Sequence, residues 1–130
     1  NKYQSPQELN VTFNQNKINK IKLDNKKIEA KAKDFMNDYI KALNKAYKKS
    51  DYKYISEYIK EDTNVSRHMK KMVNSNAKNK YSNLEFQSVK KNNENVQVIL
   101  TKEVSKEKVT SKYLLEVTDS KFKITKYKDI

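Results

Sequence analysis

The longest hydrophobic pattern in the chain runs from Asn25 to Lys49 and has the period of an α-helix. Its apolar residues recur at steps of three, four and one residue, and the positions between them are mostly Lys, Asn and Asp. No glycine or proline interrupts the run. The pattern predicts one long amphipathic helix, capped by Asp24 or Asn25, that lies with one face on a sheet. The apolar face consists of Ile28, Ala32, Phe35, Met36, Tyr39, Ile40, Leu43 and Ala46.

A different, shorter pattern precedes this helix. Apolar and polar residues alternate from Leu9 to Phe13, which predicts a short strand, and a polar connection follows up to residue 24. We therefore expect residues 1–23 to be a linker or the exit strand of a preceding domain. Residues 24–130 are expected to form the domain itself.

Two shorter helices and four strands are predicted after the long helix. Ser50 and Asp51 can cap a helix that runs to Ile59, and a third helix covers Val65 to Val73. From Tyr81 onward the period changes to two, and turn-like polar segments separate the apolar runs. The runs are Leu84 and Phe86, then Val96, Val98 and Leu100, then Val109, Tyr113, Leu115 and Val117, and finally Phe122 and Ile124.

Helices followed by consecutive strands predict an α+β domain in which a curved antiparallel sheet wraps the long helix. This order, with these lengths, resembles the cone-shaped fold of the nuclear transport factor 2 (NTF2)-like superfamily. A fold of this kind does not by itself specify a function.

Charge is the most unusual feature of the composition. The 130 residues carry 29 Lys and Arg against 16 Asp and Glu, a net charge of +13, and Arg67 is the one arginine. Lysine is a solvated point charge, which suits diffuse attraction to phosphate or carboxylate polymers better than the reading of base edges. A lysine-rich proteome would also explain the excess. The candidate residues for an anionic partner are Lys41, Lys45, Lys48, Lys49, Lys70 and Lys71.

Few residues in the chain could carry catalysis. Cysteine is absent, which excludes thiolate sites and disulfides, and glycine is absent, which excludes glycine-dependent phosphate loops. His68, the only histidine, has Asn64 and Met72 as its four-residue neighbours and is predicted to be a partly buried helix residue. No carboxylate pair or metal-ligand spacing stands out, so we expect no catalytic residue, metal or cofactor.

Tyrosines on the predicted helices are the candidates for a cavity. Tyr39, Tyr54 and Tyr58 could line the inside of a cone, although their helix-face spacing is more typical of core residues. A deep pocket with a buried ionisable group near them would indicate a small-ligand binder or an enzyme.

Four local strings stand out, and they are Glu8-Leu9-Asn10-Val11-Thr12-Phe13, the stretch from Ser50 to Lys60, Met69-Lys70-Lys71-Met72-Val73, and Lys112-Tyr113-Leu114-Leu115-Glu116-Val117. They resemble the C-terminal extracellular region of TcaA-like proteins, the Gram-positive membrane proteins associated with teicoplanin susceptibility. The resemblance implies a longer protein with a cytoplasmic zinc-ribbon segment, one transmembrane helix and extracellular domains, and no catalytic residues to transfer. The chain itself has no apolar run of about 18 residues, and it opens on Asn1 rather than Met, which favours an anchor outside this sequence.

Together these observations predict a non-enzymatic extracellular domain that contacts an anionic wall polymer such as teichoic acid, the membrane surface, or a wall-assembly protein. Such a domain would act in cell-wall homeostasis or in the response to glycopeptide antibiotics. The alternatives are a ligand-binding or enzymatic cone and a nucleic-acid-binding surface, the latter requiring tyrosines exposed beside lysines. A homodimer through the outer sheet face stays open, since that face is predicted to carry Gln97, Thr101, Thr110 and Lys112.

Overall fold

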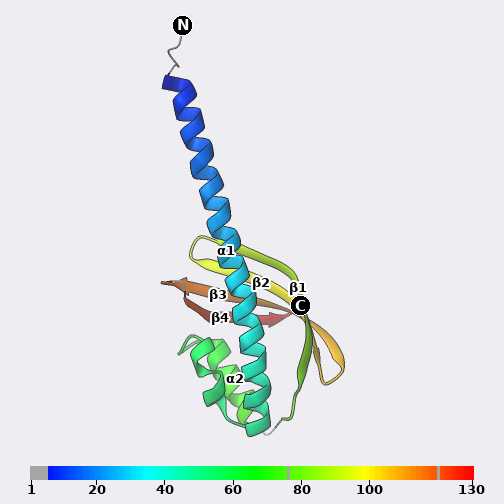
Figure 1. Ribbon diagram of the computed structural model, residues 1–130. Helices are drawn as coiled ribbons and strands as arrows, with labels where there is room; N and C mark the ends of the chain where they lie inside the picture. Colours follow the sequence, from blue (N-terminus) through cyan, green and yellow to red (C-terminus); the bar gives the residue numbers. More distant parts are fainter. Residues whose placement is uncertain (1–5, 76, 120) are drawn as a thin grey trace.

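A computed structural model describes residues 6–75, 77–119 and 121–130, with side chains from residue 24 onward. Helix α1 comes first, then two short 3-10 turns and helix α2, and four strands complete the chain (Figure 1). The bounds are α1 Pro6–Lys49, η1 Tyr52–Tyr54, η2 Ser56–Tyr58, α2 Asn64–Asn74, β1 Tyr81–Asn92, β2 Asn95–Val104, β3 Glu107–Thr118 and β4 Lys121–Asp129.

Helix α1 begins much earlier than predicted. The expected strand from Leu9 to Phe13 is wrong, because this segment belongs to α1, which starts at Pro6, and the polar connection after it is helical too. Proline is tolerated in the first turn of a helix, and once a helix exists each added residue extends it at little cost, so five alternating residues do not break it. No helix in the described part of the chain has the length and apolar character needed to cross a membrane.

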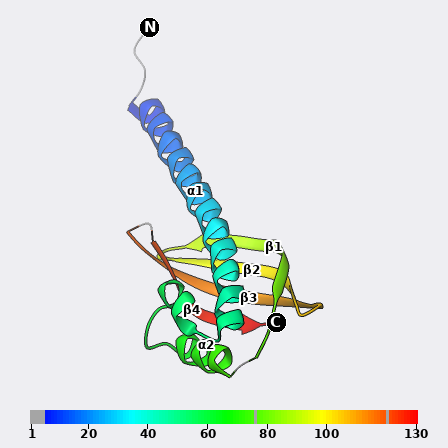
Figure 2. The same cartoon turned by 60° about the horizontal axis from the view of Figure 1, so that its bottom comes forward.

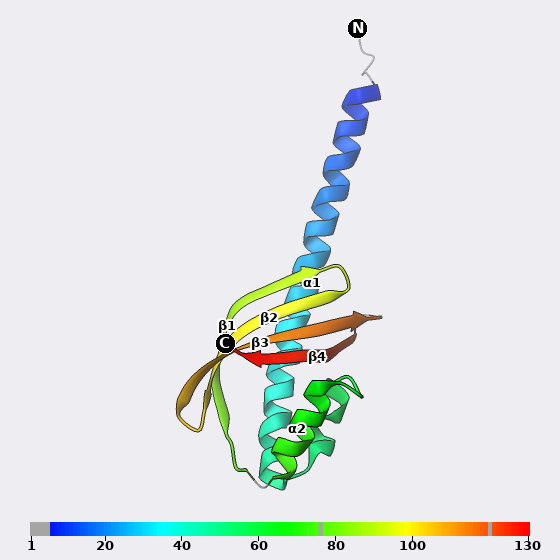
Figure 3. The same ribbon diagram turned by 180° about the vertical axis from the view of Figure 1, so that it is seen from behind.

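The four strands form one antiparallel meander in the order β1-β2-β3-β4, which confirms the predicted α+β architecture. The sheet curves across the C-terminal half of α1, and α2 lies beside β4 (Figures 2 and 3). The core lies between the sheet and α1. It includes Met36, Tyr39 and Leu43 of α1 and Val96, Val98, Leu100, Tyr113, Leu115 and Ile124 of the sheet.

The segment between α1 and α2 forms two 3-10 turns, where one short helix was predicted. Asp51 caps the first turn as predicted, because its side chain accepts a hydrogen bond from the backbone N–H of Lys53 at 2.9 Å. The chain is extended at Ile59, which forms a parallel bridge to Ile124 of β4. Pairing with the sheet therefore replaces the predicted helix and covers part of the β4 edge.

Helix α2 agrees with the prediction. Thr63 is its N-cap, and Thr63 and Ser66 form a reciprocal capping box with hydrogen bonds of 3.1 and 3.2 Å. The buried side of the helix carries Val65, Met69 and Val73. This side packs toward the core, and the N-terminal end of the helix lies near β4.

Candidate functional site

A buried lysine lies inside the sheet, where apolar residues fill the preceding positions. Inward-facing residues alternate along β2, and Lys102 follows Leu100 in this series with 1% of its surface exposed. Its Nζ donates to the hydroxyl of Tyr113 at 2.5 Å and to that of Tyr127 at 3.4 Å. The same Nζ lies 5.4, 5.0 and 4.8 Å from the ring centroids of Tyr81, Tyr113 and Tyr127. Three tyrosines from three strands therefore enclose one ammonium group.

The hydrogen-bond network continues from Lys102 to the edge of the sheet. The Tyr127 hydroxyl donates to Oδ1 of Asp129 at 2.7 Å, and the Ser111 hydroxyl donates to the same oxygen at 2.7 Å. Burial acts to raise the pKa of Asp129, but these two hydrogen bonds and the charge of Lys102 outweigh it, so the pKa is lowered. Asp129 is therefore an anion linked to Lys102 through a tyrosine hydroxyl.

Lys102 has no carboxylate at direct contact. In the described part of the chain the one ion pair joins Lys60 and Glu116, at 3.0 Å. Burial lowers the pKa of Lys102 to about 8, while the charge of Asp129 opposes this shift. A buried ionisable group with a perturbed pKa beside a groove is a candidate for a functional site.

The Lys102 side chain lines a groove of about 560 Å³, which we call the Lys102 groove. This volume lies in the range of about 300–1,000 Å³ that is typical of small-molecule sites. Its apolar wall consists of Met69, Met72, Val104 and Val109. Its polar groups include Asn79, Ser105, Glu107 and Asp129.

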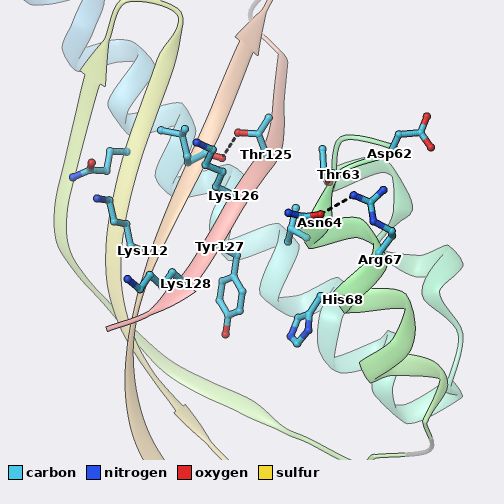
Figure 4. Close-up of a pocket in the computed structure, with 13 residues that line it drawn as sticks. Asp62, Thr63, Asn64, Arg67, His68, Lys112, Thr125, Lys126, Tyr127 and Lys128 are labelled. Atoms are coloured by element: carbon cyan, nitrogen blue, oxygen red, sulfur yellow. Dashed lines mark hydrogen bonds between the residues drawn. The ribbon is translucent and has the colours of Figure 1, made fainter.

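A second groove, of about 840 Å³, lies between α2 and the outer side of β3 and β4; we call it the basic groove (Figure 4). Its cations come from three elements and are Arg67 of α2, Lys112 of β3, and Lys126 and Lys128 of β4. Asp62 is the one acidic residue among those that line it. Arg67 donates to the side-chain oxygen of Asn64 at 2.7 Å, which orients its guanidinium group. The basic groove therefore concentrates positive charge in one concave surface.

The two grooves adjoin each other. His68 and Tyr127 line both, and Figure 4 shows their side chains projecting into the space between α2 and β4. The prediction that His68 is partly buried is wrong, because its side chain is exposed. It precedes Met69 on α2 and lies off the narrow apolar stripe that faces the core.

The predicted lysines lie outside both grooves. All six are exposed, on α1 and α2. Lys45 lies over the ring of Tyr54 at 5.0 Å and Lys70 over the ring of Tyr52 at 5.4 Å, so these two ammonium groups lie near η1. The remaining four, Lys41, Lys48, Lys49 and Lys71, are exposed, and none of them lies over a described aromatic ring.

The three predicted cavity tyrosines line neither groove. Tyr39 is buried and packs against Tyr58 and Tyr113, with ring centroids 5.8 and 6.3 Å apart. Tyr54 and Tyr58 are half-buried. Since Tyr113 contacts both Tyr39 and Lys102, the buried ionisable group that a ligand-binding cone requires does lie close to Tyr39.

Sequence reasoning missed Lys102 and Tyr127. The signal for Lys102 was present, because it follows Val96, Val98 and Leu100 at steps of two and must share their face. The signal for Tyr127 was not, because the register between β3 and β4 shifts next to Leu114, and Thr125 is the extra residue. This irregularity changes which residues beyond Ile124 face inward.

Comparison with known proteins identifies the fold family. A search of curated proteins found no match. Among solved structures, the chain is similar to an NTF2-like protein of unknown function from Cytophaga hutchinsonii, with 14% identity, a TM-score of 0.47, and coverage of 75% of this chain and 87% of that one. Residues 28–128 match the family model described as the TcaA protein NTF2-like domain, and the chain therefore belongs to this family.

Proposed function

We propose that this domain is a non-enzymatic, extracellular part of a membrane-anchored envelope protein and that it contacts an anionic wall polymer through the basic groove. Its role would lie in cell-wall homeostasis or in the response to glycopeptide antibiotics. The observation that carries the proposal is the convergence of Arg67, Lys112, Lys126 and Lys128 around one concave surface. Membership in the TcaA domain family supports the envelope setting.

The chemistry of the basic groove suits a repeating anion. Lysine ammonium groups attract phosphate or carboxylate at any orientation, so a flexible polymer can bind without a fixed register. Lysines on an edge strand such as β4 also discourage strand pairing between molecules, which gives Lys126 and Lys128 a second explanation. That explanation does not extend to Arg67, which lies on a helix.

The test compares two sets of charge-neutralising substitutions in the purified domain. One variant carries Arg67→Gln, Lys112→Gln, Lys126→Gln and Lys128→Gln, and the matched control carries Lys41→Gln, Lys48→Gln, Lys49→Gln and Lys71→Gln. Both lose the same net charge. Binding is measured to a teichoic-acid preparation and to a DNA oligonucleotide of equal phosphate count, at about 0.15 M salt, where charges more than about 8 Å apart are screened.

We expect the basic-groove variant to lose teichoic-acid binding roughly tenfold or more, and the control to lose much less. The proposal would be contradicted if both variants lost teichoic-acid binding equally and if the unmodified domain bound DNA as well as teichoic acid. That result would indicate diffuse attraction by the net charge. A larger loss in the control would instead support the helix lysines predicted from the sequence. Circular dichroism on each variant separates lost binding from lost folding.

A nucleic-acid partner has less support. Base stacking needs exposed aromatic rings beside cations. Four of the nine tyrosines, Tyr39, Tyr47, Tyr81 and Tyr113, are buried. The DNA arm of the experiment above tests this alternative directly.

A further inference from the structure

The Lys102 groove differs from the basic groove in its charge. Lys102 is positive, Asp129 and Glu107 are negative, and these groups line the same groove. The carboxylates would repel an anionic ligand, so the polymer proposed for the basic groove does not suit this one. An entirely apolar ligand would take water away from the carboxylates and offer them no hydrogen bond in return.

The Lys102 groove also offers a donor and an acceptor close together. Lys102 and Asp129 both contact the hydroxyl of Tyr127, at 3.4 and 2.7 Å. The 3.4 Å contact is long for a hydrogen bond, and an ammonium group has three protons to donate. Because Lys102 is 1% exposed, an oxygen that enters the groove reaches its Nζ by displacing the Tyr127 hydroxyl from this weak contact, while a neighbouring hydroxyl donates to Asp129.

We propose that the Lys102 groove binds a small, neutral, polyhydroxylated molecule of about one or two sugar rings. Two adjacent hydroxyl groups of this molecule form hydrogen bonds with Lys102 and Asp129. A hydroxyl group both accepts and donates, so a pair of neighbouring hydroxyls satisfies an ammonium and a carboxylate together. The apolar face of such a ring, which presents C–H groups, packs against Met69, Met72 and the half-buried ring of Tyr127. This site is separate from the polymer contact proposed above.

The test uses the three methionines of the chain as reporters. Met69 and Met72 line the Lys102 groove, whereas Met36 of α1 is buried in the core and provides an internal reference. Protein labelled with ¹³C at the methionine methyl groups is titrated with glucose, galactose, N-acetylglucosamine and maltose. Inorganic phosphate serves as the anionic comparison.

We expect at least one of these sugars to shift the Met69 and Met72 signals saturably, with Kd on the order of 1 mM and with Met36 unmoved. Asp129→Ala should weaken this binding about tenfold, since it removes one charge-assisted hydrogen bond. Lys102→Met should do the same. Lys90→Met, an exposed position on β1, should leave binding unchanged.

Four results would overturn the proposal. They are no saturable shift with any of the four sugars, a larger shift with phosphate than with sugar, a shift at Met36 equal to those at Met69 and Met72, and binding unaffected by Asp129→Ala. Asp129 is at the exposed end of β4, so its variant keeps the test valid even if Lys102→Met does not fold. Polymer binding is measured separately, and its failure leaves this result unaffected.

Discussion

Lys102 is the one charged side chain that is buried in the described part of the chain. Removing an ammonium group from water is costly unless it finds partners. Here the partners are two tyrosine hydroxyls and three tyrosine rings, and cation–π contacts contribute about 0.5–2 kcal/mol each. A methionine of similar length would avoid the cost of removing the ammonium group from water.

The buried ammonium group of Lys102 predicts an unusual dependence of stability on pH. The pKa of Lys102 is about 8 in the folded protein, whereas an unfolded lysine has a pKa of about 10.4. Between these values the unfolded chain binds more protons, so the free energy of unfolding should rise with pH, by at most about 1.4 kcal/mol per pH unit. Above about pH 10 it should fall, because burial raises the pKa of Tyr39, Tyr81 and Tyr113 and only the unfolded tyrosines ionise readily.

Urea unfolding between pH 7 and 11 measures this profile. Lys102→Met should abolish the rise between about pH 8 and 10 and leave the fall at higher pH. Lys90→Met, which removes an exposed lysine, should retain both. A rise that persists in Lys102→Met would show that another group causes it.

Among the elements, the hairpin turn between β2 and β3 carries the clearest backbone strain. Ser105 and Lys106 form a two-residue turn with φ of 50° and 80°, both in the left-handed region. Turns of this kind usually place glycine at the second position, and the chain has no glycine. The lysine therefore adopts a conformation that its Cβ disfavours.

Lys106→Gly should relieve this strain. We expect the free energy of unfolding to rise by about 0.5–1 kcal/mol, because relief of the positive φ exceeds the added entropy of the unfolded glycine. As a control, Lys108→Gly in the exposed part of β3 should lower it, since glycine weakens a strand. Chemical denaturation of both variants gives the two values. Equal destabilisation by both would argue against strain in the turn.

The elements also show which parts of the fold a sequence pattern can predict. The period of two predicted all four strands, and the helical period predicted α2 and the packed half of α1, because each pattern matches a face buried in the core. Residues 6–23 could not be placed this way, since a short alternation is compatible with either element. The same alternation that predicted β2 places Lys102 inside, whereas no local pattern signals the bulge at Thr125 before Tyr127.

At the scale of the whole molecule, both grooves lie at one end of the fold, beside α2 and β4. The sheet and α2 gather around the C-terminal half of α1, and the N-terminal part of the helix extends beyond the sheet (Figures 1 and 3). The first fully buried residue of α1 among those with described side chains is Ala32. The packed structure and both candidate sites therefore depend on the part of the chain that follows residue 24.

This arrangement predicts the effect of shortening the chain. A protein of residues 24–130 should unfold with a free energy within about 1 kcal/mol of the full chain, because the N-terminal part of α1 extends beyond the sheet (Figure 1). Among the side chains described from residue 24 onward, the core contacts of α1 begin at Ile28. A protein that begins at residue 37 should be severely destabilised, since it lacks Met36 and Phe35. Each large buried side chain removed costs about 2–5 kcal/mol, and the Phe35 ring lies 5.4 and 5.5 Å from those of Tyr58 and Phe122.

Urea unfolding and the teichoic-acid binding assay on the two shortened proteins check this prediction together. The protein of residues 24–130 should keep polymer binding, because the basic groove is formed by α2, β3 and β4. If the free energy of unfolding of that protein were lower by more than about 2 kcal/mol, residues 6–23 would stabilise the fold, and the domain would then have to include them. Unchanged stability with lost binding would instead mean that the N-terminal part of α1 takes part in the contact with the polymer.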